Sequence, residues 1–195
     1  KHDVIGVLSG DSDKDIADWR KASPDRIIPA LGDSIRMPVV DAATVARVKA
    51  MKASGDLVVL SEIGPQYMGM APDDPRLEPF WALAEELDLP VGIHVGTGPP
   101  GTPYLAPPLK DYRARLHSAR VIEEVLARHP KLRVYLMHAG YPMIDDLLAV
   151  LYTHPQVYVD VGVIVYTQPR PAFYRYLQAI VEAGFAKRVM FGIWS

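Results

Sequence analysis

Two histidines stand at the ends of short apolar runs in this chain of 195 residues. His94 closes a run that begins at Pro90, and His138 closes a run that begins at Val134. An imidazole can bind a metal ion or move a proton near neutral pH. If both runs are parallel strands, both rings face the mouth in which α/β barrels carry their chemistry. The pair predicts one site assembled from two strands, where the rings converge.

Seven apolar runs rich in Val and Ile are spaced along the chain, with helical patterns between them. They alternate little between polar and apolar residues, as expected for parallel strands that are buried on both faces. We expect strands at residues 4–9, 26–31, 57–63, 90–95, 134–138, 157–163 and 189–193. The alternation of strand and helix predicts repeated right-handed βαβ units.

The strand count and the missing glycine fingerprint decide between two α/β architectures. No Gly-x-Gly-x-x-Gly follows the first strand, which argues against a doubly wound nucleotide-binding sheet. An eightfold barrel usually takes about 250 residues and eight strands. We therefore predict a single domain over residues 1–195, a (β/α)8 TIM-type barrel that lacks its first strand unit and part of the loop after strand 8.

Helix ends and one long loop are also predicted. Asp41 can cap a helix that runs to Ala53 and stops at Gly55, and Ser12 can cap another that runs to Lys21. The Pro- and Gly-rich segment 96–108 follows the His94 strand. Loops of this length inside compact domains are often functional, so we expect this one to overhang the mouth and face the substrate.

The composition of the chain limits the classes of molecule that it is expected to bind. A net charge of −2 with interspersed charges disfavours nucleic acid, and no apolar run reaches the roughly 18 residues that a membrane span needs. Cysteine is absent, so a metal would be held by histidine and carboxylate, and a reducing cytoplasm fits best. We expect a small-molecule substrate and leave a homo-oligomer open.

Two motifs make the pattern more specific: Leu60-Ser-Glu62-Ile-Gly, and Leu136-Met-His138-Ala-Gly. Together with the His94 run they resemble the amidohydrolase superfamily, and within it the branch of amidohydrolase-related hydrolases and decarboxylases. The resemblance implies a distorted barrel with a divalent metal, usually zinc, at the strand ends. It implies that His94 is a metal ligand, and that His138 polarises water or substrate or binds a second metal. Glu62 matches a carboxylate that is a ligand in some branches and structural in others.

The chain departs from this pattern in two places. No counterpart of the superfamily's first-strand His-x-His pair is present, and Trp194 stands where the strand-8 aspartate is expected. We expect that residues are missing after Gly192. The physical role of the metal would be to lower the pKa of a bound water toward about 7, while a nearby histidine moves the proton.

The other polar and aromatic candidates have plainer interpretations. His129 and His154 precede prolines at predicted helix ends, where an imidazole interacts favourably with the helix dipole, and His117 and His2 are interpreted as structural. Asp160 is expected to pack or to form hydrogen bonds, and Arg36 to lie on the surface. Four residues that follow strands could line the pocket: Tyr67, Met68, Tyr141 and Tyr166.

Several functions remain open at this stage. The first is a metal-dependent hydrolase that cleaves a C–N or C–O bond of a small molecule. A decarboxylase on the same scaffold is its near neighbour, because the fold does not choose between the two reactions. A non-catalytic barrel without metal ligands is the second class, and a nuclease is less favoured for want of a basic groove.

Overall fold

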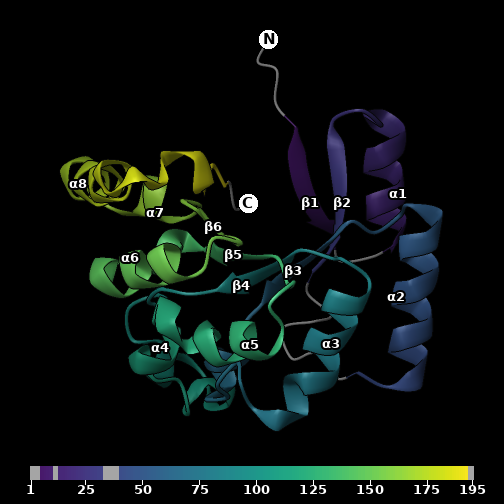
Figure 1. Ribbon diagram of the computed structural model, residues 1–195, viewed down its shortest axis with the longest axis horizontal. Helices are drawn as coiled ribbons and strands as arrows, with labels where there is room; N and C mark the ends of the chain where they lie inside the picture. The colour runs from purple at the N-terminus through teal and green to yellow at the C-terminus, as the bar shows by residue number, and fades with distance from the viewer. Residues whose placement is uncertain (1–4, 11–12, 33–39, 193–195) are drawn as a thin grey trace.

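A computed structural model describes residues 5–10, 13–32 and 40–192, and the fold below concerns these ranges. One parallel sheet of seven strands forms its centre (Figure 1), in the order β1-β2-β3-β4-β5-β6-β7. Its strands are β1 (Gly6–Gly10), β2 (Ile27–Leu31), β3 (Val59–Ile63), β4 (Val91–His94), β5 (Val134–Met137), β6 (Val157–Asp160) and β7 (Val189–Met190). All seven predicted strand positions are confirmed.

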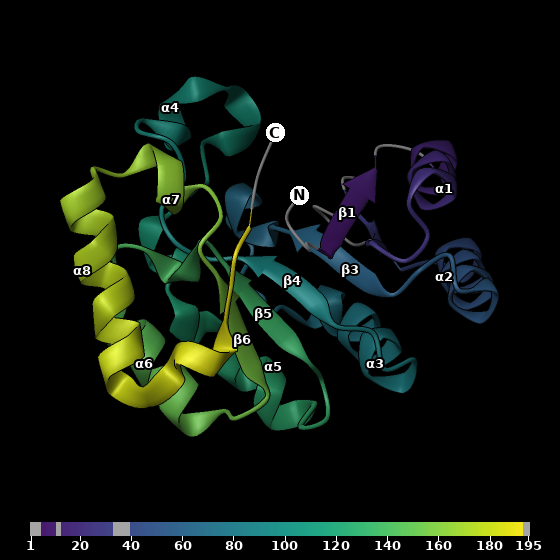
Figure 2. The same ribbon diagram turned by 90° about the horizontal axis from the view of Figure 1, so that it is seen from above.

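The strand order decides the architecture. Each strand pairs with the strand that follows it in the sequence, and the order never reverses. A doubly wound sheet must reverse its order at a switch point. The sheet is therefore the curled, barrel-type sheet that was predicted, with helices along its outside (Figure 2).

The helices occupy the connections between strands. They are α1 (Asp13–Ala22), α2 (Ala42–Ser54), α3 (Glu78–Glu86), α4 (Thr102–Leu105), α5 (Glu123–Arg128), α6 (Ile144–Thr153), α7 (Ile164–Thr167) and α8 (Arg170–Ile180). Figure 2 shows α3, α5, α6 and α8 around the curled strands. No helix in the described ranges is long and apolar enough to cross a membrane.

Helix α2 shows how the local sequence sets an element's ends. The Asp41 side chain accepts a hydrogen bond of 2.7 Å from the Thr44 amide, which satisfies a backbone donor at the helix start. Gly55 ends the helix at a φ of 78°, a left-handed conformation that favours glycine. Both predicted ends are confirmed, whereas the predicted cap Ser12 lies outside the described residues.

The core lies between the sheet and the helices. Ile93 and Leu136 in the central strands are fully buried, as is Trp81 of α3. The Trp81 indole donates a hydrogen bond of 2.8 Å to the Pro72 carbonyl, so burial leaves no polar group of this ring unpaired. Burying such side chains stabilises a fold by about 1.5–3 kcal/mol each. This packing fixes the strand ends that carry the candidate site.

The segment 96–108 is more regular than the predicted loop. It contains α4 and runs into a 3-10 turn over Pro107–Leu109. The Thr97 amide donates to the Tyr141 carbonyl at 3.0 Å, so the segment starts against the residues that follow β5. Proline at the start of each turn explains the result, because proline is compatible with the first turn of a helix.

Candidate metal centre

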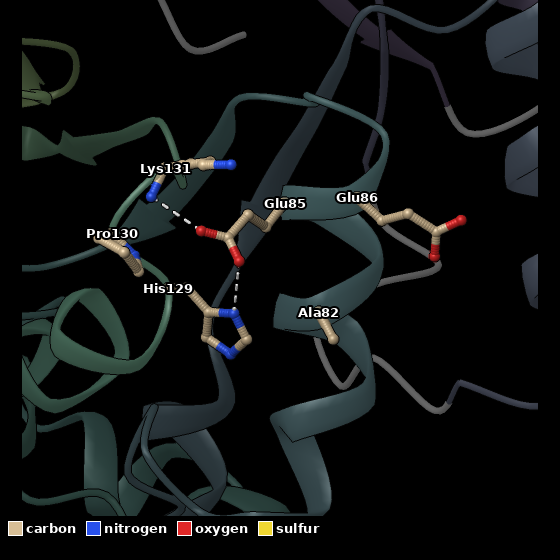
Figure 3. A pocket seen from close by; sticks show the side chains of 6 residues that line it. All are labelled: Ala82, Glu85, Glu86, His129, Pro130 and Lys131. Carbon is tan, nitrogen blue, oxygen red and sulfur yellow. Dashed lines mark hydrogen bonds and ion pairs between the residues drawn. The ribbon is translucent and has the colours of Figure 1, made fainter.

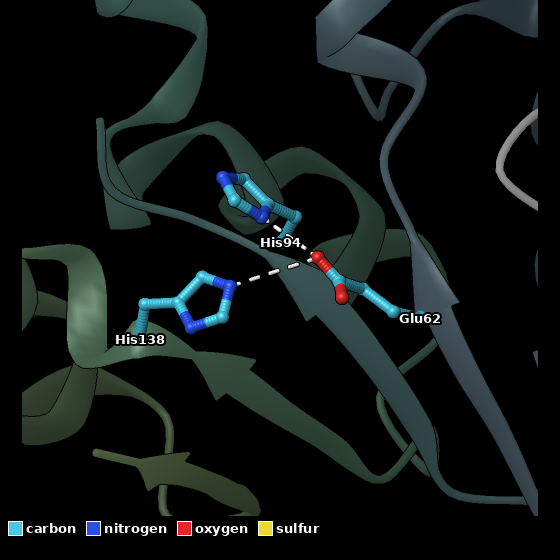
Figure 4. A group of neighbouring side chains, drawn as sticks. All are labelled: Glu62, His94 and His138. Carbon is cyan, nitrogen blue, oxygen red and sulfur yellow. Dashed lines mark hydrogen bonds and ion pairs between the residues drawn. The ribbon is translucent and has the colours of Figure 1, made fainter. Parts of the chain in front are cut away.

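Three neighbouring strands bring Glu62, His94 and His138 together. Glu62 belongs to β3, His94 is the last residue of β4, and His138 directly follows β5. Because the strands are parallel, their carboxyl ends meet at one edge of the sheet. One ligand atom from each residue lies within 4.8 Å of those of the other two, and the side chains point toward one another (Figure 4). The His94 and His138 rings converge as predicted, with centroids 4.7 Å apart.

Glu62 and Tyr67 hold the His94 ring from two sides. His94 Nδ1 lies 2.7 Å from Glu62 Oε1 and donates its proton to that carboxylate. His94 Nε2 lies 3.1 Å from the Tyr67 hydroxyl, which donates to it. This arrangement assigns the proton to Nδ1 and leaves the lone pair on Nε2. Because Nδ1 is the nitrogen that faces Glu62, a metal shared with Glu62 would replace the Nδ1 proton, and Nε2 would then donate to the Tyr67 hydroxyl.

His138 is held by the end of the next strand. Its Nδ1 donates to the Gly162 carbonyl at 3.0 Å, so Nε2 faces Glu62 Oε1 at 3.6 Å. The His138 backbone has a φ of 61°, which residues other than glycine seldom adopt. The Asp160 carboxylate accepts hydrogen bonds from the amides of His138 at 3.2 Å and Gly162 at 2.8 Å. Asp160 thus has the hydrogen-bonding role that was expected.

The charges of the centre are strongly coupled. Burial alone would raise the pKa of Glu62, but hydrogen bonds and charge from His138 and His94 lower it to about 2. Burial lowers the pKa of His94, against the opposing effect of Glu62. For His138, burial acts downward, yet the facing Glu62 carboxylate and the nearby Asp160 raise the pKa. The result is an ionised carboxylate between one neutral imidazole and one that holds a proton more readily.

The donor set fits a divalent metal ion. Two imidazoles and one carboxylate are ligands that zinc and related ions accept. Two atoms bound to one ion at about 2.1 Å can lie no more than about 4.2 Å apart, and His138 Nε2 and Glu62 Oε1 meet this limit at 3.6 Å. The Gly162 carbonyl fixes the His138 tautomer, as hydrogen bonds do for metal-binding histidines.

The centre has a further histidine that the sequence analysis missed. His117, interpreted there as structural, is fully buried, and its ring centroid lies 5.3 Å from that of His94. Burial and the His94 charge lower its pKa to about 3, although the backbone of Gln66 acts the other way. Tyr67 and Tyr112 pack against the same ring. No local pattern marks His117, because the chain returns to the site only through the fold of residues 96–117.

Only some of the predicted pocket residues reach the centre. Tyr67 does, through His94, whereas Met68 is exposed. The Tyr141 ring packs against Tyr176 with centroids 5.0 Å apart, and Tyr166 is half exposed on α7. Three other residues lie outside the described part of the chain, so the structure does not test their predictions: His2, Arg36 and Trp194.

A second histidine–carboxylate cluster, made of His129, Glu78 and Glu85, lies at the opposite, amino-terminal end of the strands. His129 ends α5, as predicted, but its ring binds carboxylates: Nε2 lies 2.9 Å from Glu78 and Nδ1 lies 3.1 Å from Glu85. An open pocket of about 440 Å³ adjoins it (Figure 3), lined by Ala82, Glu85, Glu86, His129, Pro130 and Lys131. In barrels this end usually serves stability.

A curled parallel sheet with a Glu/His/His group at its carboxyl edge is typical of metal-dependent enzymes of the barrel class. Residues 2–192 match the amidohydrolase family. The chain therefore belongs to this family, as the sequence motifs indicated. No curated protein sequence matches it significantly.

Solved structures confirm the fold. An uncharacterised TIM-barrel protein from Bordetella bronchiseptica is 22% identical, with a TM-score of 0.70, over 97% of this chain and 64% of the other. A 5-carboxyvanillate decarboxylase from Novosphingobium aromaticivorans, solved with manganese, is 17% identical, with a TM-score of 0.62, over 93% and 58%. A probable 2-pyrone-4,6-dicarboxylic acid hydrolase from Acinetobacter baumannii is 19% identical, with a TM-score of 0.59, over 97% and 67%. The chain thus spans about two thirds or less of these structures.

Proposed function

We propose that this chain is part of a metal-dependent enzyme that hydrolyses a C–N or C–O bond of a small molecule. The observation that carries the proposal is the 3.6 Å approach of His138 Nε2 to Glu62 Oε1. With Nδ1 protonated by its bond to Gly162, Nε2 presents a lone pair to a carboxylate. A cation between these two electron-rich atoms, either a proton or a metal ion, would stabilise them at this separation.

We assign Glu62 and His94 to the metal. Both lie at the strand ends, and Glu62 is held ionised by its two histidine neighbours, which is the state that binds a cation. A divalent ion here would polarise a carbonyl and lower the pKa of a bound water. Zinc suits this donor set best, and manganese is the ion bound in the similar decarboxylase.

We assign proton transfer to His138. Its raised pKa lets it hold a proton at Nε2 near neutral pH. The bond to Gly162 fixes the ring, so Nε2 is the nitrogen that exchanges the proton. In hydrolysis, the neutral form of His138 would accept at Nε2 the proton of the attacking water and then give it to the leaving nitrogen or oxygen.

Decarboxylation is the second candidate, and the raised pKa of His138 also favours it. When the carboxylate leaves as carbon dioxide, its bonding electron pair stays on carbon, and that carbon must take up a proton. The protonated form of His138, which its raised pKa favours, would supply it. Two of the similar structures carry these two chemistries in their names, a hydrolase and a decarboxylase.

Metal analysis and two substrates test this function. We expect about one divalent metal per chain, and turnover of either 2-pyrone-4,6-dicarboxylate or 5-carboxyvanillate that stops on chelation. His94→Ala should lose metal, whereas His154→Ala, at the amino-terminal edge, should keep it. Full metal content in His94→Ala, or turnover that survives chelation, would contradict the assignment.

A further inference from the structure

Three buried side-chain polar atoms in the described residues have no hydrogen-bond partner, and they belong to two residues beside His94. The atoms are Gln66 Oε1 and both ring nitrogens of His117, one of which lies near the Gln66 backbone without a hydrogen bond of good geometry. Most buried polar groups in proteins are hydrogen-bonded, so three such atoms at one place require an explanation.

Both residues are held firmly in place. Gln66 is fully buried, and its Nε2 donates to the His94 carbonyl at 2.8 Å, which leaves Oε1 as the free end of the amide. The Gly96 amide donates to the His117 carbonyl at 2.6 Å, and the His117 ring packs against Tyr112 with centroids 4.3 Å apart. The unpaired atoms are thus fixed by bonds and contacts made elsewhere in the same residues.

The hydrogen-bonding capacity of these atoms specifies what could bind them. A neutral imidazole offers one donor and one acceptor, and Gln66 Oε1 offers a second acceptor. A carboxylate only accepts, so it would leave both acceptors unpaired. A hydroxyl group donates one bond and accepts others, so it has the capacity to pair with both kinds of atom.

We propose that His117 and Gln66 form a subsite that binds a hydroxyl group of the substrate next to His94. The proposal rests on the proposed function, because it places the substrate at that centre. The aromatic rings of Tyr67 and Tyr112 beside His117 favour a substrate whose hydroxyl is carried on a flat, apolar frame.

Tyr67 is the side chain that controls access to the proposed subsite. Its ring contacts both His94 and His117, with centroids 4.7 Å and 5.3 Å away, and it is the partly exposed member of this group. Displacing this side chain would uncover the side of the His117 ring that Tyr67 covers. Substrate entry thus requires Tyr67 to move.

Phenol and fluorobenzene are matched probes, since they differ mainly in the hydroxyl group. We expect the metal-loaded protein to bind phenol about tenfold more tightly than fluorobenzene, as one or two net hydrogen bonds allow. His117→Phe should abolish this preference and His117→Asn should keep part of it, whereas His154→Phe should leave it unchanged. An equal preference in wild type and His117→Phe would overturn the subsite.

A second measurement needs no variant. The ¹⁵N resonances of the His117 ring in the wild-type protein should shift when phenol is added and stay unchanged with fluorobenzene. Unchanged resonances with phenol would refute the subsite. A His117→Phe variant that is less stable but still prefers phenol would also refute it, because the His117 ring nitrogens would then bind a resident water rather than the substrate. Metal content is measured separately, so a protein without metal that still prefers phenol would refute only the proposed function.

Discussion

Two histidine–carboxylate clusters lie at opposite edges of the same sheet, and they use their atoms differently. At the amino-terminal edge, each ring nitrogen of His129 has its own carboxylate, from Glu78 and Glu85 of α3. At the carboxyl edge, two histidines share one oxygen of Glu62.

This difference indicates that the His129 cluster is a structural link and that the Glu62 cluster is a reactive centre. Both ring nitrogens of His129 contact carboxylates of α3, so the ring joins α5 to α3 and has no nitrogen left for another partner. The Glu78 side chain is 41% exposed. Glu62 is only 16% exposed, and its oxygen is crowded by two imidazoles. Burial strengthens such charge interactions, so the cluster around Glu62 is where a cation would gain most.

The largest expected effect concerns His138. His138→Gln should lower turnover at least about 100-fold, because the side chain that moves the proton is gone, while most of the metal remains. His129→Gln is the matched control and should keep wild-type turnover. Steady-state kinetics and metal analysis of both variants measure this contrast. Equal turnover in the two variants would show that His138 has no greater role in the reaction than His129.

Glu62→Gln should weaken metal binding by at least about tenfold, since the amide is similar in size but uncharged. Glu85→Gln makes the same change in the other cluster and should leave metal affinity unaltered. Competition with a chromogenic chelator gives both affinities. If the two variants bind metal equally well, Glu62 is not a ligand.

The acid stability of the metal-free protein should also depend on Glu62. Its pKa of about 2 lies below the ordinary value of 4.5, so its contribution is present above pH 4.5 and is lost as the pH falls toward 2. The raised pKa of His138 adds stability below about pH 6.5 that is lost at higher pH. The stability difference between wild type and Glu62→Gln should thus be largest near pH 5, at most about 3 kcal/mol.

Urea unfolding at pH 3, 5 and 8 measures this difference. A difference that does not change with pH would show that Glu62 is not ionised between the two histidines.

The smallest effect should come from removing the other cluster. His129→Ala loses two contacts to partly exposed carboxylates, and such ion pairs contribute little, so we expect a loss of about 1 kcal/mol in the free energy of unfolding. Thermal unfolding measures it, with metal content as the control. A loss above about 4 kcal/mol would show that this edge matters more than its geometry indicates.

The strands and the central histidine pair were predictable because their signals are local. An apolar run that ends in histidine sets both the strand and the place of the ring, as at His94. His117 and Gln66 carry no such signal. His117 reaches His94 through a bond between Gly96 and the His117 carbonyl, 21 positions away along the chain, and such contacts depend on the folded path of the loop.

The Glu62 contact also needed the structure. The motif around Glu62 marked a carboxylate of interest, but left its role open between ligand and support. Only the pairing of β3 with β4 brings its oxygen to His94 Nδ1, and only the turn after β5 brings His138 to the same oxygen.

The support of His138 has a consequence for how this molecule could change. Both groups that orient His138, the Gly162 carbonyl and the Asp160 carboxylate, come from the end of β6. His117, in contrast, is delivered by the long connection that follows β4. New residues in that connection could therefore alter which molecule is accepted while the proton-transfer geometry stays as it is, so selectivity and reactivity can be engineered separately.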